Sequence, residues 1–404
     1  MKVCYVSAFH PPSISTPAAM LDAWPLLRCL PPELAAEGHE VVALVHAGQN
    51  DERRHDGVRY RFINPGRIAG GIGRLAGRWK PRYGPAYYTP ALRLTRALRE
   101  ERPDIVHFSG LTLDVQLAQV AWACSRQRIP LVVHFHGGVP DAGRLQRLQR
   151  FNACRVSRVL VTTFEQAQPW LDARLYTCVQ FSQVVETSSP FTGIERDEAR
   201  RATGMAGDPV YLSAGRLDAI KDPLTVLRGF ERIVEQQPDA RLYCHYLTAE
   251  MMPEIVTFLD ARPSLAERVA LRGRAPLEAM EAIYSSADFL LQASLREWSG
   301  LAVIEAMSCG CIPIVSDIPS FRMLTGGSAG KRFPVGDAEA LARAALSISH
   351  ANREALAMAC HSRFKQELSF AAMASKISAI YRDVRPDRPN AHQDTPGSGV
   401  QPDG

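Results

Sequence analysis

The feature that most constrains the fold is an alternation of short, almost continuous apolar runs with longer stretches of helical periodicity. Apolar runs of strand length lie at residues 2–7, 40–46, 104–109, 131–136 and 158–163, and again at 209–214, 240–246, 268–272, 287–292 and 312–316. Helical patterns separate them, at 86–101, 114–127, 142–154, 223–237, 252–260, 277–286, 301–309, 338–348 and 352–380. Apolar strands that alternate with helices are typical of parallel sheets covered by helices on both faces. The sequence therefore predicts an α/β protein.

The chain is too long for one ordinary domain, since its 404 residues suit two domains better. A stretch rich in Thr, Ser, Gly and charge, residues 187–208, marks the boundary. We expect two doubly wound domains that face a cleft, with ligands bound at the carboxyl ends of their strands. The last stretch, 385–404, is rich in Pro, Gly, Asp and Gln and is expected to be a disordered tail.

Composition excludes few classes of partner. The net charge of +5 is too small to require an anionic substrate or membrane. The nine cysteines include no C-x-x-C pair and are expected to be reduced, mostly buried thiols. No signal peptide is visible, and no apolar run reaches the roughly 18–20 residues needed to cross a bilayer. A cytoplasmic protein is expected.

Two glutamates eight positions apart, Glu297 and Glu305, form the first candidate site. Glu297 lies in a predicted loop with Gly300, and the helical pattern begins directly after it, at Leu301. Helix N-termini attract phosphate, whereas ionised carboxylates accept hydrogen bonds from sugar hydroxyls. Phosphate and polyol binding at one helix start suggest a nucleotide-sugar site. The alternative is a solvated loop glutamate followed by an ordinary helix glutamate.

A second candidate site follows the strand 209–214. Gly215 and Arg216 end this strand, and Lys221 lies in the next loop. Asp222 is predicted to cap a helix that opens with Pro223. The two cations can reach one diphosphate together, with Arg216 as a fork and Lys221 as a point charge. Two solvated loop cations are the alternative.

A third candidate lies in the first half, where His134 and His136 end a buried strand ahead of Gly137 and Gly138. Strand alternation places both imidazoles on the same face. A histidine at a strand end beside a cleft can donate a hydrogen bond or carry a proton. A structural histidine is the alternative. A metal site is not expected, because no third ligand is spaced nearby.

Together these motifs resemble the family 4 retaining glycosyltransferases (glycosyl transferases group 1). The resemblance covers about residues 1–380 and rests on Gly215-Arg216, Lys221, Gly273, Ser294-x-x-Glu297-x-x-Gly300-Leu301-x-x-x-Glu305-Ala306 and Gly310-x-x-Pro313. It implies the GT-B fold, with a Rossmann-like acceptor domain at 1–190 and a Rossmann-like donor domain at 200–370. A helix at 371–384 is expected to return to the first domain.

The resemblance also implies roles for individual residues. Glu305 would hold the ribose of a nucleotide-sugar donor, and Glu297 would contact hydroxyls of its sugar ring. Arg216 and Lys221 would neutralise the leaving diphosphate, next to the turn at Gly215. Because the chain contains no Asp-x-Asp, no metal cofactor is expected. Retention would follow the front-face route, in which the departing phosphate oxygen helps to deprotonate the acceptor, so Glu297 is not expected to be a covalent nucleophile.

The same resemblance places further residues around the donor. Backbone amides at the start of the second glutamate's helix would meet the diphosphate or sugar, at Ser299, Gly300 and Leu301. Arg274 would lie where the nucleotide base packs, and His136 would bind a donor hydroxyl.

The chain departs from the family's pattern at two places. The family's glycine pair after the first strand is missing, and Ser15 and Thr16 would donate hydroxyls in its place. The family's Glu-Gly-Phe-Gly becomes Glu297-Trp-Ser-Gly300, so the bulky Trp298 is expected to alter donor or acceptor preference.

Two alternative functions remain open: a sugar-nucleotide epimerase of the same fold, and a non-catalytic binding protein. The sequence does not identify the acceptor, which is expected to be a polysaccharide or other sugar, a lipid-linked molecule or a small molecule. A basic and aromatic stretch, residues 67–102, favours peripheral contact with the inner face of a membrane, or else is a solvated helix face. Nucleic acid is not expected, since no binding motif accompanies the charge.

Overall fold

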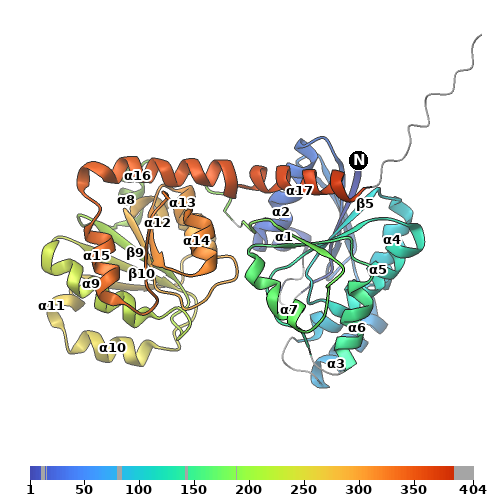
Figure 1. Ribbon diagram of the computed structural model, residues 1–404, viewed down its shortest axis with the longest axis horizontal. Coiled ribbons are helices and arrows are strands. Elements are labelled where there is room, and N and C mark those ends of the chain that lie inside the picture. Colours follow the sequence, from blue (N-terminus) through green and yellow to red (C-terminus); the bar gives the residue numbers. More distant parts are fainter. Residues whose placement is uncertain (11–13, 15, 80–83, 142–143, 188, 386–404) are drawn as a thin grey trace, which may run out of the picture.

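The computed structural model describes residues 1–10, 14, 16–79, 84–141, 144–187 and 189–385. These residues form two α/β domains that lie side by side (Figure 1). The first contains β1 (Lys2–Ser7), β2 (Glu40–His46), β3 (Asp51–His55), β4 (Val58–Ile63), β5 (Ile105–Ser109), β6 (Leu131–His134), β7 (Arg158–Val161) and β8 (Gln180–Gln183). Its helices are α1 (Pro17–Ala23), α2 (Pro25–Ala36), α3 (Arg67–Trp79), α4 (Leu92–Glu101), α5 (Asp114–Gln127), α6 (Arg144–Ala153) and α7 (Gln168–Asp172), with 3-10 turns at Pro85–Tyr88 and Phe164–Gln166.

The second domain contains a smaller sheet. Its strands are β9 (Val210–Gly215), β10 (Arg241–Tyr246), β11 (Val269–Gly273), β12 (Phe289–Gln292), β13 (Ile312–Ser316) and β14 (Lys331–Phe333). Its helices are α8 (Arg196–Thr203), α9 (Pro223–Gln236), α10 (Met252–Asp260), α11 (Pro263–Ala266), α12 (Leu277–Ser286), α13 (Leu301–Ser308), α14 (Pro319–Thr325), α15 (Ala338–Leu346) and α16 (His350–Arg363). A π turn, Phe364–Leu368, then leads to α17 (Phe370–Val384).

The order of the strands gives each sheet one topological switch point. The first sheet runs β3-β4-β2-β1-β5-β6-β7-β8, and the second runs β11-β10-β9-β12-β13-β14. Successive strands are added outward in opposite directions from the β1/β5 pair and from the β9/β12 pair. Loops that leave such a pair diverge and open a crevice for ligands at the carboxyl ends of the strands.

All strand pairs are parallel except β3 and β4, which form an antiparallel hairpin at the edge of the first sheet. The sequence pattern missed β3, because its residues Asp51–His55 alternate no apolar side chains and it is an exposed edge strand. The prediction of purely parallel sheets is therefore wrong at this edge only.

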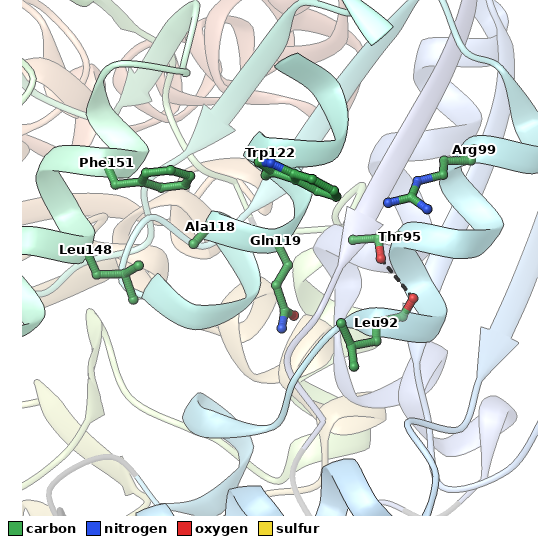
Figure 2. A pocket seen from close by; sticks show the side chains of 8 residues that line it. All are labelled: Leu92, Thr95, Arg99, Ala118, Gln119, Trp122, Leu148 and Phe151. Atoms are coloured by element: carbon green, nitrogen blue, oxygen red, sulfur yellow. Dashed lines mark hydrogen bonds between the residues drawn. The ribbon is translucent and has the colours of Figure 1, made fainter. Parts of the chain in front are cut away.

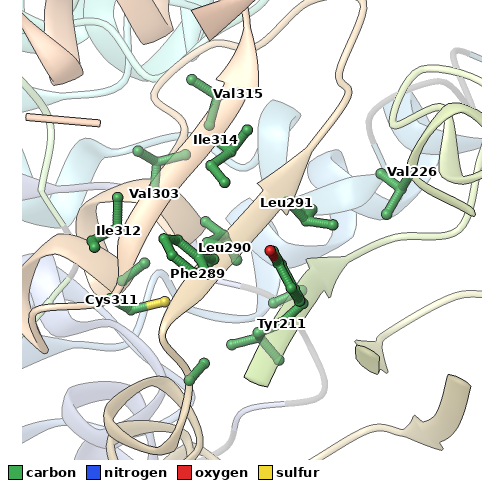
Figure 3. Close-up of a cluster of buried hydrophobic side chains, with 14 of the residues drawn as sticks. Tyr211, Val226, Phe289, Leu290, Leu291, Val303, Cys311, Ile312, Ile314 and Val315 are labelled. Carbon is green, nitrogen blue, oxygen red and sulfur yellow. The ribbon is translucent and has the colours of Figure 1, made fainter. Parts of the chain in front are cut away.

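The second sheet is held by apolar packing around β9, β12 and β13 (Figure 3). All four residues of β12 and all five of β13 are buried, as the near-continuous apolar runs predict. Phe289 stacks on Tyr211 with ring centroids 5.1 Å apart. Each such side chain contributes about 1.5–3 kcal/mol by leaving water, which fixes the strand ends that carry the candidate site.

Three predicted segments differ from the structure. The helix predicted at 86–101 begins only at Leu92, because Pro90 cannot continue a helix from the turn before it. The strand predicted at 131–136 ends at His134, ahead of the Gly137 turn. The helix predicted at 352–380 is divided by the π turn, after which Ser369 caps α17 by accepting from the amide of Ala372 at 3.2 Å.

α17 crosses from the second domain to the first (Figure 1). Its side chains Met373, Ile377 and Tyr381 are buried in the core that also contains residues of β1 and β2. The hydroxyl of Tyr381 lies 2.6 Å from Nδ1 of His107 on β5. This helix therefore ties the two domains together beyond the linker that joins β8 to α8.

The predicted tail begins within the structure, since Arg385 is ion-paired with Asp104 at 3.1 Å. Its other residues, 386–404, lie outside the described part of the chain. Among the described residues, no helix combines the length and the apolar character required to cross a bilayer.

Candidate active site

The candidate site of the second domain lies at the β9/β12 switch point. Arg216 and Lys221 follow β9, and Ser294 and Glu297 follow β12, so neighbouring strands deliver both pairs to one edge of the sheet. The amide of Leu295 donates to the carbonyl of Ile220 at 2.8 Å and joins the two loops. The sheet topology thus brings together cations and a carboxylate that are far apart in sequence.

Lys221 and Glu297 form an ion pair at this edge. Their side chains are only 16% and 13% exposed, so water screens the pair little. The hydroxyl of Ser294 also donates to Glu297, to the same Oε1, at 2.8 Å. The carboxylate expected at the sugar ring is therefore held by a cation and a hydroxyl.

Arg216 is held by Asp218, a residue that the sequence analysis did not single out. Its Nε donates to Oδ2 of Asp218 at 2.6 Å, while Oδ1 accepts from the amides of Ile220 and Lys221 at 3.0 Å each. Burial pushes the pKa of Asp218 upward, but the hydrogen bonds from Arg216 and the amides outweigh it and lower the pKa below its ordinary value. The terminal nitrogens of Arg216 make no hydrogen bond within the described residues, and its side chain is 47% exposed.

Glu305 lies inside α13, where the hydroxyl of Tyr284 donates to its Oε2 at 2.8 Å. Burial, and then the nearby Glu305 charge, raise the pKa of Tyr284 well above its ordinary value, so the phenol remains a donor. Gly300 is the N-cap directly before α13, and its φ of +68° favours glycine. A Cβ there would also lie 2.9 Å from Leu324, so the tight entry to the helix requires glycine.

In the first domain, His136 lies between Ser109 and Glu186. Its Nε2 is 2.7 Å from the hydroxyl oxygen of Ser109, and its Nδ1 is 3.0 Å from Oε1 of Glu186. Oε2 of Glu186 accepts from the hydroxyl of Ser299 at 3.0 Å. Glu186, in the linker after β8, therefore connects His136 of one domain with Ser299 of the other.

Glu186 was missed by the sequence analysis, because a single acid in a polar linker carries no pattern. Burial alone would raise the pKa of its carboxyl. The electrostatic interaction and hydrogen bond with His136, with smaller contributions from His134 and the Ser299 hydroxyl, override that effect and lower the pKa to about 2. Glu186 is thus a buried carboxylate that stays ionised.

A cavity of about 420 Å³ opens between the domains at the β1/β5 switch point. Ser109, His136 and Glu186 line it from the first domain, and Leu301, the first residue of α13, lines it from the second. Trp298 closes over the neighbouring turn: a Cβ at Gly137 would lie 3.3 Å from its indole. The polar lining of this cavity therefore comes from the first domain and the linker, and Leu301 borders it from the second domain.

Four further candidates of the sequence have other surroundings or lie outside the described residues. Arg274 is exposed at the end of β11, which β10 separates from β9. Thr16 caps α1, where its Oγ1 accepts from the amide of Ala19 at 3.2 Å. Ser15 lies outside the described residues. His134 is fully buried and does not line the cavity. It stacks on His136 with ring centroids 4.7 Å apart, and its ring is tilted relative to that of His107, 5.5 Å away.

A separate surface groove lies between α4, α5 and α6 (Figure 2). Trp122 and Phe151 line it, and its one drawn hydrogen bond joins the hydroxyl of Thr95 to the carbonyl of Leu92 at 2.8 Å. It has no carboxylate and is less suited to a polyol than the cavity between the domains.

Comparison with known proteins identifies both domains. Residues 29–174 match the glycosyl transferase 4-like domain, and residues 208–350 match glycosyl transferases group 1, so the matches together cover more than half of the chain. The chain is 25% identical over 253 residues to the GDP-mannose:cellobiosyl-diphosphopolyprenol alpha-mannosyltransferase of Xanthomonas oryzae pv. oryzae, which covers 61% of this chain and 63% of that protein. The matched region thus spans less than two thirds of that relative.

Solved structures show the same fold. Sucrose-phosphate synthase from Thermosynechococcus elongatus superposes with a TM-score of 0.65 at 18% identity, covering 95% of this chain and 98% of that one. Anabaena HepE in complex with UDP and glucose gives a TM-score of 0.63 at 15% identity, covering 95% and 100%. The chain therefore belongs to the family 4 glycosyltransferases, and its two sheets form the GT-B fold of that family.

Proposed function

We propose that the chain transfers a sugar from a nucleotide-diphosphate sugar to a hydroxyl of an acceptor, with retention and without a metal ion. The observation that carries this proposal is the cluster at the β9/β12 switch point, where two cations adjoin a carboxylate. A diphosphate needs such cations, a sugar ring needs such an acceptor of hydrogen bonds, and α13 begins beside them.

In this proposal the donor's diphosphate lies against Arg216 and Lys221. The free terminal nitrogens of Arg216 suit a bidentate contact to phosphate oxygens. Lys221 shifts part of its interaction from Glu297 to the diphosphate, which releases Glu297 to accept from hydroxyls of the sugar. Glu305, oriented by Tyr284, accepts from the ribose. Charge that develops on the leaving diphosphate is then met by fixed cations, which lowers the barrier.

Metal independence is proposed because these cations supply the charge that a metal would supply, and because the sequence contains no Asp-x-Asp. Retention is proposed without a covalent intermediate. The carboxylate nearest the proposed sugar, Glu297, is ion-paired with Lys221, which weakens it as a nucleophile. The alpha product in the name of the Xanthomonas relative supports the same stereochemistry.

Relatives differ in donor and acceptor. The Xanthomonas protein is named for GDP-mannose and a diphosphopolyprenol-linked acceptor, whereas HepE is in complex with UDP and glucose. We therefore propose a hexose donated from a nucleoside diphosphate to a sugar, lipid-linked or small-molecule acceptor. The cavity around His136 and Glu186 would hold the donor sugar and the acceptor hydroxyl.

The test is to incubate the full chain with UDP-, GDP- and ADP-hexoses, with and without a panel of sugar and polyprenol-diphosphate acceptors. Release of nucleoside diphosphate together with a product whose anomeric configuration matches the donor supports the proposal. Conversion of the donor sugar in the absence of acceptor indicates an epimerase. Binding of a donor without any turnover indicates a non-catalytic protein, and either of these outcomes overturns the proposal.

A further inference from the structure

Helix α3 differs from an ordinary surface helix, because it buries its small residues and exposes its large apolar ones. Its buried side consists of small residues that let the backbone approach the 3-10 turn Pro85–Tyr88 and the residues after it. A Cβ at Gly73 would fall 2.3 Å from Oγ1 of Thr89, and one at Gly77 would fall 3.0 Å from the nitrogen of Pro85. The fold thus requires glycines on the inner side of this helix.

The large apolar residues of α3 face solvent instead. Ile68, Ile72 and Leu75 are 84%, 48% and 60% exposed. Their spacing of i, i+4 and i+7 aligns them along one side of the helix, here named the apolar stripe. A surface helix of a globular protein ordinarily buries such residues. A continuous exposed row therefore marks a surface that a membrane or another molecule covers.

A row of arginines runs beside the apolar stripe. Arg67, Arg74 and Arg78, here named the arginine row, share one side of α3 by the same spacing rule and are exposed. Within the part of the chain that the structure describes, they enter no ion pair. The sequence from 67 to 99 contains no Asp or Glu, and its cations are Arg67, Arg74, Arg78, Lys80, Arg82, Arg93, Arg96 and Arg99.

The arginine row also borders a cavity. Arg67 and Arg74 line a space of about 420 Å³ at the carboxyl ends of β1, β2 and β4, together with His46. Nδ1 of His46 donates to the carbonyl of Ala8 at 3.0 Å, while its buried Nε2 has no hydrogen-bond partner among the described residues. Burial lowers the pKa of His46 to about 4, so this Nε2 is a hydrogen-bond acceptor. The cavity therefore places cations that suit a phosphate beside a buried, neutral imidazole.

We propose that α3 docks the first domain on an anionic phospholipid bilayer, with the apolar stripe in the lipid interface and the arginine row against lipid phosphates. Charge complementarity favours a bilayer over a protein partner, because a long acid-free segment matches a uniformly anionic surface. Docking would place the mouth of the His46 cavity at the headgroups. The inference concerns binding alone and stands or falls separately from the transfer reaction.

The experiment is co-sedimentation of the full chain with vesicles of phosphatidylcholine, alone or mixed with phosphatidylglycerol. The test variants are I68S/I72S/L75S and R67Q/R74Q/R78Q. The matched controls change exposed residues of the second domain: V256S/M358S for the stripe and R201Q/R228Q for the row. Circular dichroism checks that each variant is folded, which is expected because the changed side chains are exposed.

Wild type and both controls should bind vesicles that contain phosphatidylglycerol. Their affinity for vesicles of phosphatidylcholine alone should be at least tenfold weaker. Loss of the arginine row should weaken binding roughly a hundredfold, and loss of the apolar stripe at least tenfold. The proposal is overturned if wild type ignores anionic vesicles, or if either test variant binds like its control. Dimerisation of wild type that I68S/I72S/L75S abolishes, without vesicle binding, would instead assign α3 to a second copy of the chain.

Discussion

Lys221 and Glu297 are ion-paired although they lie 76 residues apart, because adjacent parallel strands deliver them to the same switch point. The cation assigned to the diphosphate and the carboxylate assigned to the sugar thus hold one another before any donor binds. Breaking one member leaves a poorly solvated partner. We therefore expect changes at either residue to lower stability as well as activity, whereas changes at the half-exposed Arg216 should lower activity with little effect on stability.

Arg216→Ala should lower turnover by roughly 10²–10³, the typical loss of one electrostatic contact to developing charge. Its exposed pair with Asp218 contributes under about 1 kcal/mol, so the melting temperature should change little. Steady-state kinetics and a thermal melt check this. Arg232→Ala is the matched control, because Arg232 on α9 is also exposed and ion-paired, with Glu235 at 3.1 Å. Equal turnover in the two variants would remove Arg216 from the donor site.

Substitutions of the two carboxylates should change different kinetic constants. Glu305 is assigned to the ribose, which does not change in the reaction, so Glu305→Ala should mainly raise the donor KM, by roughly 1.5–3 kcal/mol. Glu297 is assigned to a ring that gains positive character, so Glu297→Ala and Glu297→Gln should mainly lower kcat. Initial rates over a range of donor concentrations separate these effects. The same pattern in both alanine variants would mean that the pair is structural.

Activity should survive removal of divalent ions. Arg216 and Lys221 are positioned to neutralise the diphosphate, so chelation with EDTA should leave most of the rate. The measurement is the transfer rate before and after EDTA treatment, with a metal-dependent transferase as the positive control. Full loss of activity, restored by magnesium or manganese, would contradict the proposed role of the two cations.

Stability should fall as the pH drops below about 6.5. Burial lowers the pKa of His46 to about 4 and of His107 to about 3, and lowers that of His134 well below its ordinary 6.5. Below pH 6.5 the unfolded chain binds protons that the folded chain does not bind. His46 and His107 therefore each cost about 2 kcal/mol at pH 5, and His134 adds a loss in the same direction. The stability is fully present above pH 6.5.

Thermal melts between pH 7.5 and 5 check this, and a drop of roughly 10 °C is expected. His46→Asn should flatten the profile, whereas His350→Asn, at an exposed position, should leave it unchanged. A melting temperature that stays constant across this range would show that the buried rings do not control acid stability.

Much of this arrangement follows from the sequence, because strands buried on both faces leave apolar runs and site residues lie directly after them. Arg216, Lys221 and Glu297 were predicted in this way to lie after two strands, and the structure has them after β9 and β12. Glu186 was not predicted, because it belongs to a linker and its partners, His136 and Ser299, come from different domains.

Other features depend on tertiary context in the same way. Asp218 and Tyr284 act by orienting Arg216 and Glu305, and such partners carry no sequence spacing. The reversed packing of α3 also escaped prediction. Its glycines look like helix breakers until Thr89 and Pro85 are seen against them.

The most direct test of the central claim is a thermal-shift titration of the full chain with UDP, GDP and ADP and their hexose conjugates, on wild type and Arg216→Ala. One nucleotide series should raise the melting temperature of wild type in a saturable way. Arg216→Ala should shift this titration to at least tenfold higher ligand concentration, while Arg232→Ala should not. A wild-type melt that no nucleotide moves, or an equal shift in Arg216→Ala, would contradict the assignment of the β9/β12 cluster as the donor site.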